Sequence, residues 1–128
     1  MNLQRVWWTL GGVLVAAAIV ICLLPSQDVP TAFELSDKLS HITGHGVLAL
    51  YFTGLVPRRN WWKIFIFLLV MGIAIEFAQL YMHVGREADV RDVLANSTGA
   101  LLGLALGRVG LSRWPELAAW LLGRRATQ

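Results

Sequence analysis

The chain has almost no cysteine and little charge, and both shortages exclude classes of protein. Cys22 is the single cysteine among 128 residues and lies inside an apolar run, which excludes a disulfide framework and a thiolate metal site. Only 15% of the residues are charged, whereas 56% are hydrophobic. This composition is too apolar for a disordered chain or an ordinary water-soluble domain.

The sequence also lacks the marks of a secreted precursor, of a transporter with inverted repeats and of a nucleic-acid-binding protein. No small-x-small cleavage site follows the first apolar run, which argues against a signal peptide. The two halves of the chain do not mirror each other, as inverted repeats would. The net charge is +3, but the basic residues flank apolar runs. Because no basic face carries aromatic stacking platforms, we expect no nucleic-acid partner.

Long apolar runs are what the sequence has instead. Four of them can span a bilayer core at about 1.5 Å per helical residue, and they cover residues 6–24, 39–56, 63–82 and 92–109. Residues 25–38 are expected to form a polar loop. A segment at 115–123 opens with Pro115 and Glu116, typical of a helix start, and is expected on the membrane surface. The predicted fold is all-α: a single polytopic membrane domain over 1–128, with a four-transmembrane-helix bundle and a short C-terminal interfacial helix.

Charge is sorted between the two ends of these predicted helices. Eight of the eleven basic residues flank one set of ends, namely Arg5, Arg58, Arg59, Lys63, Arg108, Arg113, Arg124 and Arg125. Seven of the eight acidic residues flank the other set, namely Asp28, Glu34, Asp37, Glu76, Glu87, Asp89 and Asp92. Positively charged loops stay in the cytoplasm, so both termini are predicted to be cytoplasmic.

Polar side chains converge at the acidic end of three predicted helices. They are Asp37, His41 and His45 on the second helix, Glu76 and Gln79 on the third, and Asp89, Asp92 and Asn96 on the fourth. Spacings of three and four residues put each set on one helix face. An ionisable group inside a bilayer costs on the order of 3 kcal/mol, whereas an interhelical hydrogen bond returns about 0.6 kcal/mol. The balance favours a functional pocket over structural pairing alone.

The two histidines and Glu76 have more than one interpretation. His41 and His45 are spaced to ligate a divalent metal with Glu76 or Asp89, zinc or manganese by donor type. His41 and Glu76 are alternatively a general acid and base. In the structural interpretation, one histidine is satisfied by Asp37 and the other lies at the interface.

Arg86 is the candidate for holding an anion, because its guanidinium binds a phosphate or carboxylate through two nitrogens. The alternative is a salt bridge within its loop, to Glu87 or Asp89. Lys38 is either an interface charge or a further ligand contact. The expected ligand-binding set is Asp37, Lys38, Gln79, Arg86, Asp89, Asp92 and Asn96.

Small residues repeat every four positions along the fourth predicted helix, at Ala95, Gly99, Gly103 and Gly107. Such spacing lets two helix backbones approach closely. We expect this face to pack against another helix, and it also offers a surface for a homo-oligomer.

Together these motifs resemble those of the VanZ-like family of small bacterial membrane proteins. The resemblance covers residues 36–107 and rests on three motifs, Asp37-Lys38-x-x-His41, Glu76-x-x-Gln79 and Arg86-x-x-Asp89-x-x-Asp92-x-x-x-Asn96. The family's namesake is associated with low-level resistance to teicoplanin, a glycopeptide antibiotic with a lipid tail. The resemblance implies a bacterial cytoplasmic (inner) membrane location and a role in the cell envelope. His45 departs from the family pattern, which usually has Phe or Tyr there.

The leading functional hypothesis is an outward-facing pocket that binds an amphiphile at the outer leaflet. A lipid-linked cell-wall precursor or a lipoglycopeptide would suit it, with Arg86 on the anionic head and with Gln79 and Asn96 donating hydrogen bonds. One alternative is a membrane-embedded acid–base or metal-dependent enzyme that acts on a lipid-linked substrate. Another is an assembly protein that meets its partner through the glycine face.

Overall fold

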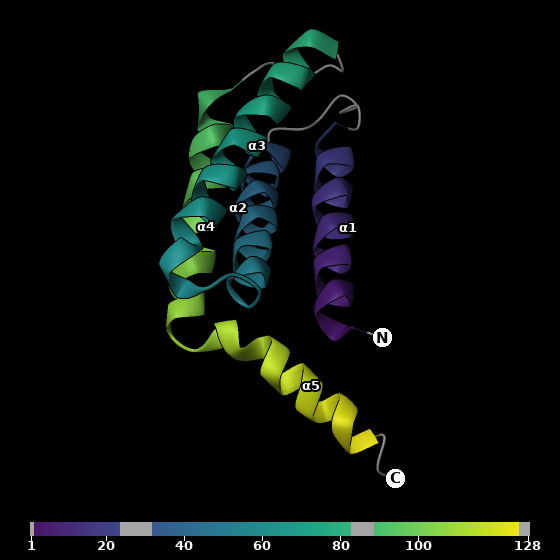
Figure 1. Cartoon of the computed structure of the whole chain (residues 1–128). Helices are drawn as coiled ribbons and strands as arrows, with labels where there is room; N and C mark the ends of the chain where they lie inside the picture. The colour runs from purple at the N-terminus through teal and green to yellow at the C-terminus, as the bar shows by residue number, and fades with distance from the viewer. Residues whose placement is uncertain (1, 24–31, 83–88, 126–128) are drawn as a thin grey trace.

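The chain is a set of helices joined by short turns in the computed structural model, which describes residues 2–23, 32–82 and 89–125 (Figure 1). Within these ranges no strand occurs, so the all-α prediction is confirmed. The long helices are α1 (Leu3–Leu23), α2 (Ala32–Thr53), α3 (Trp61–Met82), α4 (Val90–Arg108) and α5 (Trp114–Arg125). Short 3-10 helices precede α3 and α5, namely η1 (Arg58–Asn60) and η2 (Leu111–Arg113).

Two stretches of helix are long and apolar enough to cross a membrane, Leu3–Leu23 and Arg58–Met82. A third is obtained if Val90–Arg108 and Leu111–Gly123, which meet at a bend of 77°, are counted as one broken span. The chain is therefore a helical protein with two or three membrane-capable helices. The sequence predicts four membrane-spanning helices.

The start of α2 differs from the prediction. The helix begins at Ala32, whereas the sequence analysis places residues 25–38 in a loop. The polarity of this segment favours a loop. However, the sequence between Pro30 and Gly44 contains neither proline nor glycine, the two residues that disfavour a helix interior most. Asp37 and Lys38 therefore belong to the same rigid element as His41.

Helices α2 and α4 are the most closely packed pair. A Cβ atom added to Gly99 would overlap the carbonyl oxygen of Ile42, and one added to Gly103 would overlap that of Gly46. Only glycine allows backbones to come this near. The small-residue face is buried in this contact within the chain and comprises Ala95, Gly99, Gly103 and Gly107. The predicted homo-oligomer through that face stays a prediction, and it would have to displace α2.

Aromatic side chains join three helices at the basic end of the bundle. The indole N–H of Trp114 donates to the carbonyl oxygen of Tyr51 at 3.0 Å, and the Tyr51 hydroxyl donates to the carbonyl oxygen of Trp7 at 2.7 Å. The rings of Tyr51 and Trp114 stack with centroids 4.8 Å apart. Gly110, with a φ of 114°, makes the turn that brings α5 to this cluster. Amphipathic rings of this kind are enriched where a membrane meets water.

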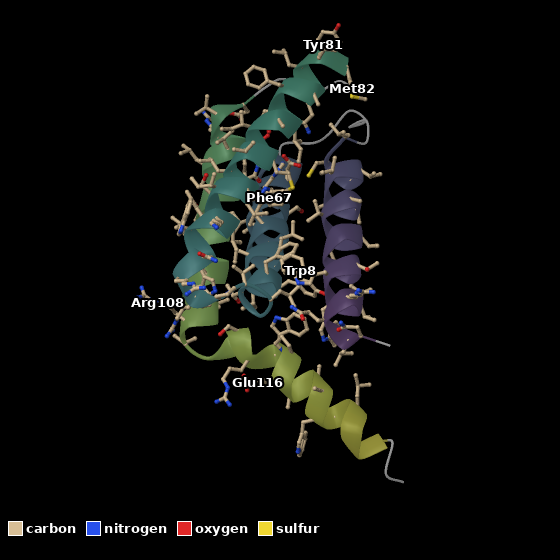
Figure 2. All side chains as sticks on the ribbon, viewed as in Figure 1. Trp8, Phe67, Tyr81, Met82, Arg108 and Glu116 are labelled. Atoms are coloured by element: carbon tan, nitrogen blue, oxygen red, sulfur yellow. The ribbon has the colours of Figure 1, made fainter. Side chains whose placement is uncertain are left out.

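Helix α1 stands beside the bundle of α2, α3 and α4 (Figure 1). Gly11 is its one buried residue, whereas the other three helices share a core that includes Leu48, Leu68, Ile75 and Ala100. Trp8 of α1 and Phe67 of α3 project into the space between the two helices (Figure 2). Because α1 packs loosely against the other helices, two openings remain along its length.

Replacing Gly99 by Ala should destabilise the bundle, because the added methyl group pushes α2 and α4 apart. Overpacking of this kind costs about 1–3 kcal/mol, which unfolding in sodium dodecyl sulfate, followed by circular dichroism, would measure. Gly44→Ala is the matched control, since a Cβ at Gly44 meets nothing within 4 Å. The control should keep its stability or gain up to about 1 kcal/mol. Equal losses in both variants would contradict the close α2–α4 contact.

Candidate functional site

Lys38 of α2 joins two carboxylates at the start of α4. Its ammonium group forms an ion pair with Asp92 Oδ1 and lies 3.2 Å from Asp89 Oδ2. The side chain of Asp92 is 9% exposed, so the buried carboxylate has its countercharge within reach. Lys38 is thus engaged inside the protein. The sequence analysis missed this pairing because Lys38 and Asp92 are 54 positions apart.

Asp89 connects the start of α4 with α3. Its Oδ1 accepts a hydrogen bond from the backbone N–H of Arg91 at 2.9 Å and so caps the helix. This hydrogen bond, together with the ammonium group of Lys38, lowers the pKa of Asp89. The backbone N–H of Asp89 donates to Glu76 Oε2 at 3.0 Å. Glu76 Oε1 is buried and has no hydrogen-bond partner among the described residues.

His41 lies between α2 and α4 and is buried. Its Nδ1 is 2.9 Å from Asn96 Oδ1, and its Nε2 is 3.6 Å from Asp37 Oδ2 and 3.9 Å from Asp92 Oδ2. Because an amide oxygen only accepts, this pairing puts a proton on Nδ1. The lone pair of a neutral His41 would then face two carboxylates. A proton on Nε2, or a cation beside it, removes that repulsion.

The metal-ligand set that the structure brings together differs from the one expected. Within the described ranges, Asp37, His41 and Asp92 each place one potential metal-ligand atom within 4.8 Å of the other two. His45 and Glu76, which the sequence analysis combined with His41, are not in this group. His45, one helical turn further along α2, lines the opening between α2 and α1.

Two predicted site residues face α1. Gln79 Nε2 donates to the carbonyl oxygen of Cys22 at 2.7 Å, so this amide group holds α1 against α3. One of its two N–H groups is therefore engaged inside the protein. His45 is 3% exposed, and its Nε2 has no hydrogen-bond partner in the described part of the chain.

An opening of about 720 Å³ lies between α1 and α2, beside Asp37 and His41, and we call it the α1–α2 crevice. The wall from α2 is mixed: beside the apolar Leu39, Val47 and Leu48 it presents five polar residues, namely Asp37, Ser40, His41, Thr43 and His45. The wall from α1 is apolar and includes Leu14, Ala18, Ile21 and Cys22. The wall from α1 could not be predicted from the sequence, because α1 carries no polar residue beside the crevice. The crevice can take a molecule that is polar on one side and apolar on the other.

A polar cluster thus brings together most of the residues that the sequence predicts for the site. Residues from α2, α3 and α4 meet in it, namely Asp37, Lys38, His41, Glu76, Asp89, Asp92 and Asn96. Arg86, the expected anion contact, lies outside the described residues, and its role stays a prediction.

The comparisons with known proteins find one family. The model of the family described as VanZ/LLP1 matches residues 18–111, which include α2, α3, α4 and the whole polar cluster. None of the curated proteins and none of the solved structures matches the chain.

Replacing Lys38 by Met should destabilise the protein, because Asp92 would stay buried without its cation. A buried group that loses its partner costs about 1–3 kcal/mol, which thermal unfolding in detergent would measure. Adding Asp92→Asn should restore much of the loss, since the amide carries no charge. Lys63→Met, at an exposed lysine of the other helix end, is the control. An equal effect at both lysines would contradict the structural role of the ion pair.

Proposed function

Because the chain belongs to the VanZ/LLP1 family and has membrane-capable helices, we propose that it binds the polar head of an amphiphile in the α1–α2 crevice. In this proposal α1, α2, α3 and α4 span the bacterial cytoplasmic membrane and α5 lies on its inner surface. The sorting of charge supports the orientation, with Arg5, Arg58 and Arg108 at the end opposite the polar cluster. Both termini are then cytoplasmic.

The observation that carries the proposal is a buried polar atom at the opening that has no hydrogen-bond partner among the described residues. His45 Nε2 is such an atom, and His45 shares the crevice wall with Asp37 and His41. Buried polar groups nearly always have partners, so an unpaired one at an opening suggests a ligand that supplies the missing bond. An apolar wall faces these residues across the crevice and suits a hydrocarbon tail.

The ligand class follows from these two walls. A lipid-linked cell-wall precursor and a lipoglycopeptide both combine a hydrogen-bonding head with a lipid tail. His45 adds a contact to those proposed for Gln79 and Asn96, since one of the two N–H groups of the Gln79 amide already donates to the carbonyl oxygen of Cys22. Arg86 remains the proposed contact for an anionic head, because guanidinium groups bind phosphate bidentately.

A second candidate function is metal-dependent chemistry at His41, and the grouping of its Nε2 with two carboxylates favours it. A histidine that binds a metal usually donates its other N–H to a neighbouring group, as Nδ1 does here toward Asn96. Imidazole and carboxylate donors suit zinc or manganese. Asp92 would share its oxygens, with Oδ1 on Lys38 and Oδ2 toward His41. The metal would supply a Lewis acid beside the crevice.

Gly44→Leu should close the crevice, since Gly44 lines it and has open space at its Cβ position. We expect the variant to lose at least about tenfold of the amphiphile that co-purifies from bacterial membranes, equivalent to about 1.4 kcal/mol of binding energy. Mass spectrometry of lipid extracts measures the loss. Gly123→Leu is the matched control, because Gly123 of α5 is equally open at its Cβ position but lies outside this crevice. An unchanged lipid profile in Gly44→Leu would refute the binding role.

The metal hypothesis has a test of its own. Purified protein equilibrated with zinc or manganese and then desalted should retain about one ion per chain, as measured by elemental mass spectrometry. His41→Ala should lose the ion, because it removes the central ligand. His45→Ala should keep it, since His45 lies outside the ligand group. Absence of bound metal in the unmodified protein would exclude this candidate and leave the amphiphile proposal standing.

A further inference from the structure

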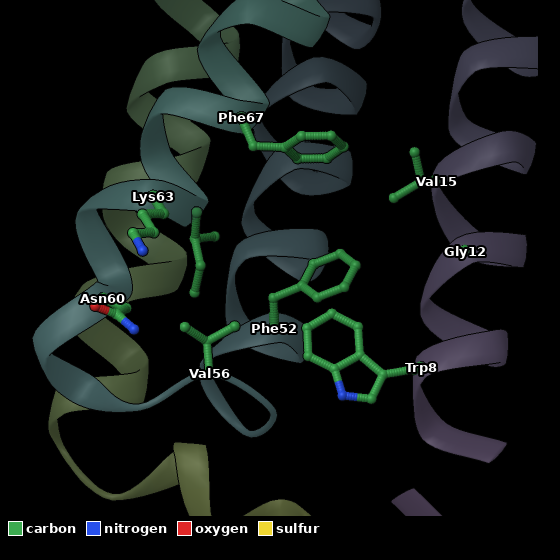
Figure 3. A pocket seen from close by; sticks show the side chains of 9 residues that line it. Trp8, Gly12, Val15, Phe52, Val56, Asn60, Lys63 and Phe67 are labelled. Carbon is green, nitrogen blue, oxygen red and sulfur yellow. The ribbon is translucent and has the colours of Figure 1, made fainter. Parts of the chain in front are cut away.

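A second opening lies between α1 and the basic ends of α2 and α3, and we call it the α1–α3 groove (Figure 3). Its volume is about 410 Å³. Its walls are hydrocarbon and aromatic, formed by Trp8, Val15, Phe52, Val56, Ile64 and Phe67. No member of the polar cluster lines this groove. The two openings are therefore separate sites on α1.

Two polar side chains, Asn60 and Lys63, lie at the side of the groove away from α1 (Figure 3). Lys63 is exposed, and the ion pairs between described side chains do not include it. Its ammonium group lies 5.6 Å from the centre of the Trp62 ring. A cation–π contact at an exposed site is weak, so the ammonium group can turn toward an anion at little cost.

The neighbouring arginine is engaged elsewhere. Arg58 donates to the carbonyl oxygen of Arg108 at 2.9 Å, at the end of α4, and its guanidinium lies 5.5 Å from the centre of the Trp61 ring. Lys63 is thus the cation that the groove itself presents. An apolar channel with a cation and an amide at its rim is complementary to a lipid with an anionic head.

The location of the groove identifies which lipids meet it. The basic helix ends face the cytoplasm if positively charged loops stay inside. The cytoplasmic leaflet contains anionic lipids that attract Lys and Arg near its surface. Hydrocarbon tails gain little by leaving the bilayer for the groove, since lipid tails are as apolar as leucine. Selection among lipids must then depend on the charge of the head.

We propose that the α1–α3 groove binds an acyl chain of an anionic glycerophospholipid of the inner leaflet. The phosphate is held by the Lys63 ammonium group and the Asn60 amide, and the chain lies between Trp8 and Phe67. The bound lipid fills the gap that α1 leaves and so supports the helix on this side. This site is independent of the amphiphile site in the α1–α2 crevice.

Lipid retention in nanodiscs tests the proposal. Protein in nanodiscs of equal parts phosphatidylglycerol and phosphatidylcholine is released into detergent, and its lipid adducts are counted by native mass spectrometry. We expect a preference for phosphatidylglycerol of about fivefold, the contribution of one lysine near a membrane surface. Lys63→Glu should abolish the preference. Arg59→Glu makes the same change of charge at an exposed residue outside the groove and should keep it.

Two glycine variants separate this site from the crevice. Gly12→Leu fills the groove at an open position and should reduce the adducts of both lipids. Gly44→Leu fills the crevice and should leave the phosphatidylglycerol preference unchanged. Where Lys63→Glu fails to insert or fold, as judged by circular dichroism and gel filtration, Lys63→Gln replaces it. Equal retention of the two lipids by the unmodified protein would overturn the proposal, as would equal losses in Lys63→Glu and Arg59→Glu.

Discussion

The close contact between α2 and α4 is the constraint on which the polar cluster depends. Glycines at 99 and 103 let the two backbones approach until an added Cβ would overlap a carbonyl oxygen. Short side chains such as Asp92 and Asn96 can therefore reach across to α2. If the helices moved apart by the width of a methyl group, the 2.9 Å contact between His41 and Asn96 would be lost. The close packing of α2 against α4 thus determines the geometry of the polar cluster.

The polar cluster contains four carboxylates, those of Asp37, Glu76, Asp89 and Asp92, against one lysine and one histidine. Lys38 lies against Asp89 and Asp92, and His41 lies between two carboxylates. In the described part of the chain, Glu76 Oε1 and Gln79 Oε1 are nevertheless buried without a partner. Unpaired acceptors in a low-dielectric interior are costly. His45 Nε2, also buried without a partner among the described residues, lines the crevice, where a ligand with a hydroxyl or amine group would lower that cost.

Helix α1 is held at its two ends and open between them. The Tyr51 hydroxyl binds the carbonyl oxygen of Trp7 at one end, and the Gln79 amide binds that of Cys22 at the other. Between these ends Gly11 is its single fully buried residue, and side chains such as Val15, Ala18 and Ile19 are partly buried against the core. This arrangement explains how one helix forms a wall of both the crevice and the groove.

Sequence alone was sufficient for features that depend on local periodicity and composition. It identified the helices, the small-residue face and the convergence of Asp37, His41, Asp92 and Asn96, because spacing along a helix defines a face. It misjudged the start of α2, where a polar segment without proline or glycine forms the first turns of the helix. Only the tertiary structure decided that Lys38 pairs with Asp92 and that His45 turns toward α1. Both features depend on how far each helix is rotated about its own axis. That rotation is set by contacts between residues far apart in the sequence, such as the glycines of α4 and the carbonyl groups of α2.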